Sequence, residues 1–274
     1  MKTEVLQRIS TLQEGTQGWT FTSQQVDDVF TIRVALPASY ERSEQSYPVL
    51  YVLDGDRSFG LAASTIAYIN LGSNFGMGKQ IPEMIVVGIG YERGVIPWLF
   101  TRVRDFTPTV DPTFNYNNPN FRIPVSGKAE AFLSCLREEL MPALKSQYRI
   151  DPALSMVASH SMAGLFALYA MLQPEQLFQK YLAVCPFVGW DNNILFELEE
   201  RYARAHQELQ VEVFFAITGH EPTPPYREEV QAFFERLQQR QYRNFRCHLA
   251  LYLEDNHFSV WSKAFIDGLV YLFK

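Results

Sequence analysis

The sequence predicts an α/β protein built on a doubly wound, mostly parallel sheet flanked by helices. Short segments rich in β-branched and aromatic residues alternate with segments of helical length. Most of the strand-like segments are near-continuous apolar runs, as expected for parallel strands that are buried on both faces. Strands and helices that alternate in this way imply right-handed crossovers between parallel neighbours.

The strand and helix candidates follow one another along the chain. Strands are expected at 29–37, 47–55, 84–91, 154–159, 181–186, 211–219 and 247–253. Helices are expected at 58–69, 127–147, 161–172, 227–240 and 260–273. The helix at 161–172 is apolar nearly all round, which predicts a position in the centre of the protein rather than on its surface.

The segment 92–126 fits no regular element, and aromatic residues are spread through its prolines and asparagines. These residues are Trp98, Phe100, Phe106, Phe114, Tyr116 and Phe121. Long loops are usually functional or disordered, and the aromatic content argues against disorder. We therefore expect a wall or lid over a binding pocket, with Trp98 and Tyr116 touching the substrate. In the alternative, the rings anchor a surface excursion to the core.

Length and composition favour one domain over two and exclude several classes of protein. The chain has 274 residues, 47% of them hydrophobic, and a formal charge of −6 with scattered basic residues. This charge argues against a nucleic-acid partner. No apolar run reaches the roughly 18 residues of a membrane span, and no secretion signal opens the sequence, so a soluble cytoplasmic protein is expected. The chain has an odd number of cysteines, and they are widely spaced: Cys135, Cys185 and Cys247. We expect them to be small buried residues that form neither a disulfide framework nor a zinc site.

The segment SMVASHSMAGLFALYAML at 155–172 has the layout of a nucleophile elbow centred on Ser161. A sharp turn between a strand and a helix lifts a serine out of the chain, beside a base and facing backbone donors. The pattern Gly-x-Ser-x-Gly would need glycine where Ser159 and Ala163 stand. Both replacements are small, as the strained turn requires. Serine-dependent acyl chemistry is the first hypothesis.

An activated serine needs a base, and His257 is the strongest candidate. It follows the last expected strand, in the loop EDNHFSV just before the final helix. Loops at the carboxyl ends of parallel strands gather on one edge of the sheet, where Ser161 should also lie. The other histidines are expected to have structural roles: His160, His206, His220 and His248.

The acid that would orient the imidazole is predicted less tightly. Glu221 is the preferred candidate, because it follows the strand at 211–219 that precedes the histidine strand. Asp191, Asp255 and Glu254 compete with it, and a serine–histidine dyad without an acid is also open.

Charge on a tetrahedral intermediate needs backbone donors. The amide of Met162, directly after the nucleophile, and the amide of Asp56, in the turn after the strand at 47–55, are expected to supply them. Asp56 would contribute only its main chain, because a carboxylate facing an oxyanion would be repulsive.

These segments resemble the esterases of the esterase D type, which have the α/β-hydrolase fold, and particularly the branch of ferric enterobactin and related siderophore esterases. The segments that carry the resemblance are YPVLYVLDGD, TRVRDFTP, FLSCLREELMPALKSQYRIDP, SHSMAGLFALYAML and EDNHFSV. The resemblance implies that Ser161 is the nucleophile and His257 the base. It also implies that Arg104 contacts an anionic or catecholate part of the substrate, although this arginine could equally pair with a neighbouring carboxylate.

The sequence thus predicts a serine esterase that cleaves a small-molecule carboxylic ester through an acyl-enzyme on Ser161. This chemistry requires no metal or organic cofactor. Two alternatives stay open. One is an acyltransferase that uses the same intermediate, and the other is a binding protein that keeps the fold but has lost competent geometry.

Overall fold

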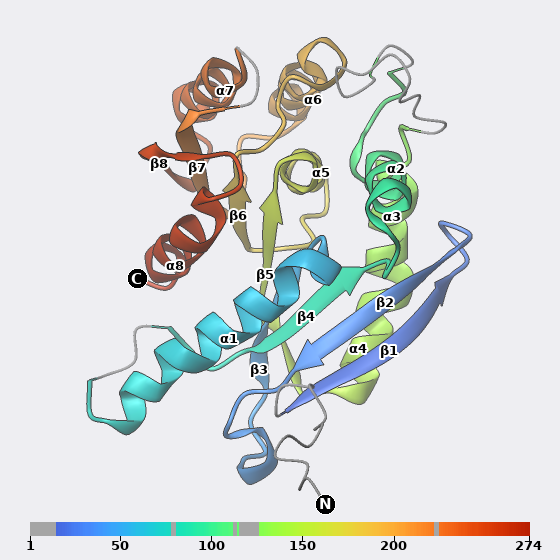
Figure 1. Ribbon diagram of the computed structural model, residues 1–274. Coiled ribbons are helices and arrows are strands. Elements are labelled where there is room, and N and C mark those ends of the chain that lie inside the picture. Colours follow the sequence, from blue (N-terminus) through green and yellow to red (C-terminus); the bar gives the residue numbers. More distant parts are fainter. Residues whose placement is uncertain (1–14, 78–80, 112–113, 115–125, 222–224) are drawn as a thin grey trace, which may run out of the picture.

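In the computed structural model, residues 15–77, 81–111, 114, 126–221 and 225–274 are described. They form one eight-stranded sheet in the order β1-β2-β4-β3-β5-β6-β7-β8 (Figure 1). The strands are β1 (Thr16–Ser23), β2 (Asp28–Ala35), β3 (Tyr47–Val52), β4 (Ile85–Gly90), β5 (Ile150–His160), β6 (Lys180–Val184), β7 (Glu212–His220) and β8 (Arg246–Asn256). The predicted fold class is confirmed.

The sheet is antiparallel at one edge and parallel through the rest. β1 pairs with β2, and β2 with β4, in antiparallel register, whereas β4, β3, β5, β6, β7 and β8 are all parallel neighbours. All six residues of β4 are buried, as are the last four of β3. Burial on both faces explains why these strands are continuously apolar in the sequence.

Helices cover both faces of the sheet. They are α1 (Gly55–Asn74), α2 (Val95–Phe106), α3 (Ala129–Ser134), α4 (Met141–Gln147), α5 (Met162–Met171), α6 (Trp190–Ala205), α7 (Tyr226–Arg240) and α8 (Val260–Leu272). A π-helical segment, η2 (Cys135–Leu140), joins α3 to α4, and a short 3-10 helix, η1 (Tyr40–Arg42), precedes β3. α1 packs beside α8, whereas α2 and α3 pack against α5, which contacts α6 (Figure 1). All ten residues of α5 are buried, in agreement with its all-round apolar sequence.

Three elements differ from the sequence prediction. The segment 92–126, expected to lack regular structure, contains α2, whose buried positions include Thr101, Arg102 and Asp105. The helix carries Pro97 near its start and lies in a segment rich in prolines and asparagines, which are typical of loops. The sequence predicts no strand at β1, because β1 is the edge strand and most of its side chains are exposed. α6 was missed as well, and it opens with three residues of left-handed backbone, Asp191, Asn192 and Asn193.

The parallel strands end together on one edge of the sheet. Ser161 follows β5, Glu221 follows β7, and His257 follows β8. The turn from β3 into α1 opens onto the same edge. Among the described residues, no helix is long and apolar enough to cross a membrane.

Candidate active site

Ser161 occupies a strained turn between β5 and α5. Its φ is 59° and its ψ is −119°, a backbone conformation that side chains with a Cβ rarely adopt. Three backbone hydrogen bonds hold the turn: the Ser161 amide donates to the carbonyl oxygen of Val184 at 2.9 Å, and its carbonyl oxygen accepts from the amides of Phe187 at 3.0 Å and Leu165 at 3.1 Å. The turn therefore has the geometry that the elbow sequence predicts.

The residues that replace glycine in the elbow pattern are accommodated. Ser159 is fully buried, and its hydroxyl donates to the carbonyl oxygen of Leu182 at 2.9 Å. Ala163 is fully buried as well. The close approach falls at Gly164 instead, where an added Cβ would lie 2.7 Å from the Cα of Pro186.

His257 lies beside the carboxylate of Glu221. The distance from Nδ1 of His257 to Oε2 of Glu221 is 2.7 Å, and both side chains are less than one-tenth exposed. The other carboxylate oxygen of Glu221 accepts from the hydroxyl of Thr218 at 2.7 Å and from its amide at 3.2 Å. Burial acts to raise the pKa of Glu221, but the hydrogen bonds from His257 and Thr218 help to lower it to about 2. An ionised carboxylate at Nδ1 keeps the proton there and leaves Nε2 as the basic nitrogen.

The other candidate acids lie elsewhere or are engaged. Asp255 binds the Lys263 ammonium at 2.8 Å and the Ser259 hydroxyl at 3.0 Å. Glu254 is exposed on β8, and Asp191 lies in the left-handed turn that opens α6. Glu221 is thus the candidate that contacts His257, and its role as the acid stays a prediction.

His160 packs against the histidine loop rather than pointing into solvent. Its Nε2 lies 2.6 Å from the carbonyl oxygen of His257, and the two imidazole centroids are 4.6 Å apart. Burial and the neighbouring His257 lower the pKa of His160 to about 3. A neutral ring with Nε2–H facing a carbonyl oxygen is the tautomer that fits this contact. His160 therefore ties the elbow to the loop that carries His257.

Tyr226, which the sequence did not single out, packs against His257 near the turn of Ser161. Its buried ring meets the imidazole of His257 edge-on at 5.3 Å, and its hydroxyl donates to the carbonyl oxygen of Cys185 at 2.7 Å. The neighbouring Ser161 side chain acts to lower the pKa of Tyr226, which burial raises well above its ordinary value. The sequence carries no signal for this residue, because it opens an ordinary amphipathic helix.

The two expected oxyanion donors lie in the first turns of helices, where amides have no helical acceptor. Met162 is the first residue of α5, and Asp56 is the second of α1. Asp56 packs against the end of β4, where a Cβ added to Gly90 would lie 2.6 Å from the Asp56 amide. Both carboxyl oxygens of Asp56 are buried without a hydrogen-bond partner among the described residues. Burial and the nearby charge of Asp54 raise the pKa of Asp56.

The expected substrate contacts have different surroundings. Arg104 donates to Asp105 through Nε at 2.6 Å and to Asp28 through Nη1 at 2.7 Å, so it pairs with carboxylates as the alternative interpretation allowed. Trp98 is half-buried on α2, and its indole nitrogen donates to Asp54 at 3.1 Å. Tyr116 lies outside the described residues. Substrate contact by any of the three stays a prediction.

The site also groups three side chains of metal-binding type. His160, Cys185 and His257 place potential ligand atoms within 4.8 Å of one another. However, Nε2 of His160 and Nδ1 of His257 are engaged in hydrogen bonds, and burial raises the pKa of the Cys185 thiol. A metal requires deprotonated, available donors, so this donor set fits a hydrogen-bonded site better than a metal site. All three cysteines of the chain are free, and Cys135 and Cys185 are buried as predicted, whereas Cys247 is partly exposed.

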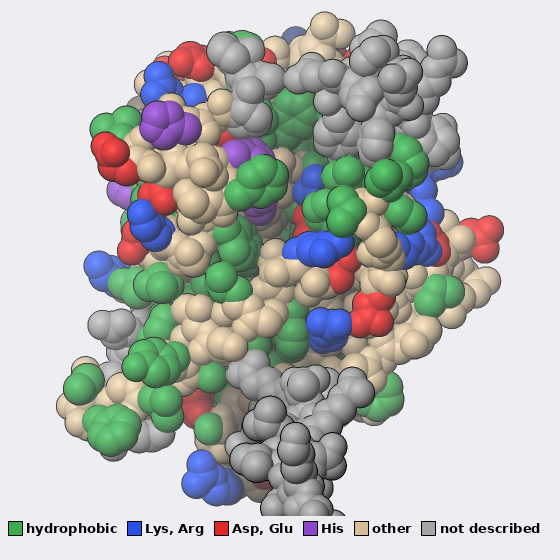
Figure 2. Space-filling model, viewed as in Figure 1, with side chains coloured by type: hydrophobic (Ala, Val, Ile, Leu, Met, Phe, Trp, Pro, Cys, Tyr) green, Lys and Arg blue, Asp and Glu red, His purple; other side chains and the backbone are tan. Residues whose placement is uncertain are grey.

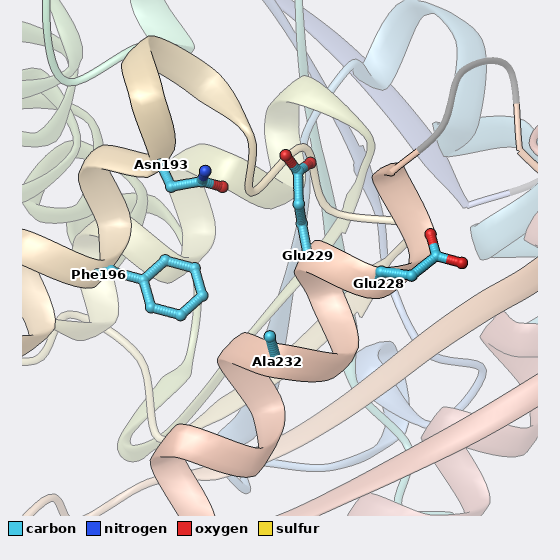
Figure 3. A pocket seen from close by; sticks show the side chains of 5 residues that line it. All are labelled: Asn193, Phe196, Glu228, Glu229 and Ala232. Atoms are coloured by element: carbon cyan, nitrogen blue, oxygen red, sulfur yellow. The ribbon is translucent and has the colours of Figure 1, made fainter.

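The space-filling view shows histidine side chains beside a depression near the middle of one face, with lysine or arginine side chains across from them (Figure 2). A separate pocket of about 370 Å³ lies between α6 and α7 (Figure 3). Its lining residues are Asn193, Phe196, Glu228, Glu229 and Ala232, none of which is a predicted site residue. It plays no part in the arrangement around Ser161.

Comparisons with known proteins identify the family of this chain. The family described as "Putative esterase" matches residues 23–272. The ferri-bacillibactin esterase BesA of Bacillus subtilis is 25% identical over 251 residues, which cover 90% of this chain and 85% of BesA. An IroE-like serine hydrolase from Shewanella oneidensis is 29% identical with a TM-score of 0.81, covering 94% of this chain and 80% of its own. The BES protein from Bacillus cereus, 23% identical, shares the fold with a TM-score of 0.86 over 98% of this chain and 100% of its own. The chain therefore belongs to this esterase family and has the α/β-hydrolase fold.

Proposed function

We propose that this chain hydrolyses carboxylic esters through an acyl-enzyme on Ser161, with His257 as base and then acid and Glu221 as the orienting carboxylate. The observation that carries the proposal is the hydrogen bond between Glu221 and Nδ1 of His257. The loop that carries His257 is also bound to the nucleophile turn, through His160. The hydrogen bond to Glu221 leaves Nε2 of His257 as the proton acceptor next to the elbow.

In the first half of the reaction, Oγ of Ser161 attacks the ester carbonyl carbon and its proton passes to Nε2 of His257. The carbonyl oxygen becomes an oxyanion, which the amides of Met162 and Asp56 stabilise. The tetrahedral intermediate then expels the alcohol, which takes its proton from His257. The ionised Glu221 stabilises the imidazolium that forms in between.

In the second half, water replaces the alcohol. His257 takes a proton from the water as it attacks the acyl carbon, a second oxyanion forms, and Ser161 leaves with that proton as the acid is released. No cofactor enters any of these steps.

We infer that the substrate is a siderophore ester. BesA is named for the ferric form of bacillibactin, and a relative from Emericella nidulans, 24% identical over 282 residues, is named a siderophore enterobactin esterase. A chain 25% identical to the first over 90% of its length is a candidate for the same substrate class.

Two measurements test the proposal. The first is hydrolysis of a chromogenic ester panel graded by acyl length and extended to aromatic and trilactone esters. Ser161→Ala and His257→Ala are expected to lower turnover by about 10⁴-fold or more while leaving the fold intact. Ser159→Ala is the matched control, because its hydroxyl is buried and donates to the carbonyl oxygen of Leu182.

The second measurement is labelling with a fluorophosphonate probe, which reacts with activated serines. The expected result is one adduct, on Ser161, that the Ser161→Ala variant lacks. A wild-type protein that fails to label and fails to cleave the panel would contradict the proposal and favour a binding protein with this fold.

A further inference from the structure

We propose that Arg102 is a positioning residue that holds the two turns carrying the oxyanion amides at a fixed separation. One of these turns runs from β3 into α1 and carries Asp56, and the other is the elbow that carries Met162. The inference rests on the proposed function, because it assigns Arg102 to the oxyanion site of that same reaction.

Arg102 binds the first turn through a bidentate ion pair with Asp54. Its Nε lies 3.1 Å from Oδ1 of Asp54 and its Nη2 lies 2.8 Å from Oδ2. The two side chains are 6% and 7% exposed, so the pair is shielded from solvent. Two parallel hydrogen bonds fix direction as well as distance, which a single contact would not do.

The ion pair restrains the backbone of the turn through Asp54. Its φ is 51°, a left-handed conformation, and its carbonyl oxygen accepts the amides of Arg57 and Ser58 at 2.8 and 3.0 Å in the first turn of α1. Asp56 lies between these contacts in the chain. The ion pair therefore holds the residue that sets the start of α1 and with it the direction of the Asp56 amide.

The same guanidinium reaches the second turn. Nη2 of Arg102, already bound to Asp54, also lies 3.4 Å from the carbonyl oxygen of His160, a longer contact than the pair with Asp54. His160 directly precedes Ser161 and is two residues before Met162. One side chain thus contacts both turns, each two residues before an expected oxyanion donor.

Aromatic rings keep the guanidinium in place. Its carbon lies 4.8 Å from the ring centroid of Trp98 and 5.8 Å from that of Phe106, both on the same helix as Arg102. The indole of Trp98 also donates to Oδ1 of Asp54 at 3.1 Å. Rings on two sides favour a planar cation, so lysine is not an equivalent replacement here.

The consequence of this arrangement is kinetic. An oxyanion hole works only when both donors reach the developing charge together, and a displacement of about 1 Å can cost about 100-fold in rate. Loss of Arg102 frees the two turns to shift relative to each other. Substrate binding in the ground state depends much less on this spacing.

The experiment compares Arg102→Lys with the double variant Arg102→Gln, Asp54→Asn. The double variant leaves no unpaired buried charge, so it retains its fold, and asparagine tolerates the left-handed backbone at position 54. We expect kcat and the rate of fluorophosphonate labelling of Ser161 to fall about 10- to 100-fold in both variants, with KM changed by less than about threefold. Arg240→Lys is the matched control, because Arg240 pairs with buried Glu199 between α6 and α7.

Folded Arg102 variants that match the wild type in kcat and labelling rate would overturn the inference, even if they melt at a lower temperature. The inference would also be overturned if Arg240→Lys lost as much kcat and thermal stability as the Arg102 variants, because weakening any buried ion pair would then have the same effect. Failure of the proposed function has a different signature, namely a wild-type protein in which Ser161 does not label at all.

Discussion

The Glu221 carboxylate lies 2.7 Å from Nδ1 of His257, across the ends of two neighbouring parallel strands. Glu221 is anchored by Thr218, the third residue before it, through both a hydroxyl and an amide hydrogen bond. This local anchor fixes the carboxylate before it meets the imidazole. It also helps to hold the pKa of Glu221 near 2, against burial, so that the carboxylate is ionised throughout the neutral range.

Glu221→Gln is expected to lower kcat by about 10³- to 10⁴-fold, less than Ser161→Ala or His257→Ala. The amide oxygen would stay with the two Thr218 donors and leave the NH2 group facing Nδ1, which favours the tautomer with the proton on Nε2 and cannot stabilise the imidazolium. The measurement is steady-state hydrolysis of a chromogenic ester, with exposed Glu254→Gln as the control. An unchanged rate in Glu221→Gln would favour a serine–histidine dyad.

His160 is expected to make stability depend on pH. Its pKa is about 3 in the folded protein because of burial and the neighbouring His257, against 6.5 for the ordinary side chain. Above pH 6.5 this side chain is neutral in both the folded and the unfolded protein. As the pH falls from 6.5 toward 3, it takes up a proton only in the unfolded protein, so the free energy of unfolding decreases.

Urea unfolding at about pH 7 and about pH 5 measures this contribution. Wild type should lose more of its free energy of unfolding between the two conditions than His160→Gln, which cannot take up a proton. Equal losses in the two proteins would contradict the prediction, because they would mean that His160 takes up a proton as readily in the folded protein as in the unfolded one.

Much of the fold was predictable because burial on both faces leaves a direct mark on the sequence. β3 and β4 are continuously apolar for that reason, and the turn at Ser161 follows from a strand, small residues and an apolar helix in succession. The approach of His257 to this edge follows from parallel strand order.

What could not be predicted depends on contacts between distant residues. α2 buries Arg102 because Asp54, 48 positions away, pairs with it, and no local pattern encodes that partner. Similarly, Tyr226 packs against His257 only because α7 begins beside the ends of β6 and β7. Polar residues that are buried in pairs look like surface residues when a sequence is read locally.

Tyr226→Phe is expected to lower both kcat and stability. Without the hydroxyl, the buried carbonyl oxygen of Cys185 loses its donor, which costs about 1–3 kcal/mol, and the polar surroundings of the Ser161 side chain change. We expect kcat to fall about 10-fold with little change in KM.

Tyr242→Phe is the matched control for this variant, since the buried hydroxyl of Tyr242 donates to Glu199 at 2.7 Å, in the cluster between α6 and α7. It should lose comparable stability in urea unfolding while keeping kcat. If Tyr226→Phe also kept kcat, the tyrosine would serve only to support the fold.

Gly164→Ala is expected to damage the elbow from below. A Cβ there would lie 2.7 Å from the Cα and 2.8 Å from the Cβ of Pro186, closer than real contacts allow. Since Pro186 directly precedes Phe187, whose amide binds the Ser161 carbonyl oxygen, α5 must move relative to the turn that supports the nucleophile. We expect a loss of about 1–3 kcal/mol in the free energy of unfolding and a fall in kcat of about 10- to 100-fold.

Gly60→Ala is the control, because Gly60 is exposed within α1 with nothing near its Cβ position. Alanine there should add about 0.5–1 kcal/mol to the free energy of unfolding. Urea unfolding and ester hydrolysis on both variants separate a steric effect at Pro186 from the general effect of replacing glycine in a helix. A Gly164→Ala protein as stable and active as the wild type would contradict the prediction, because it would show that the extra Cβ fits between α5 and Pro186.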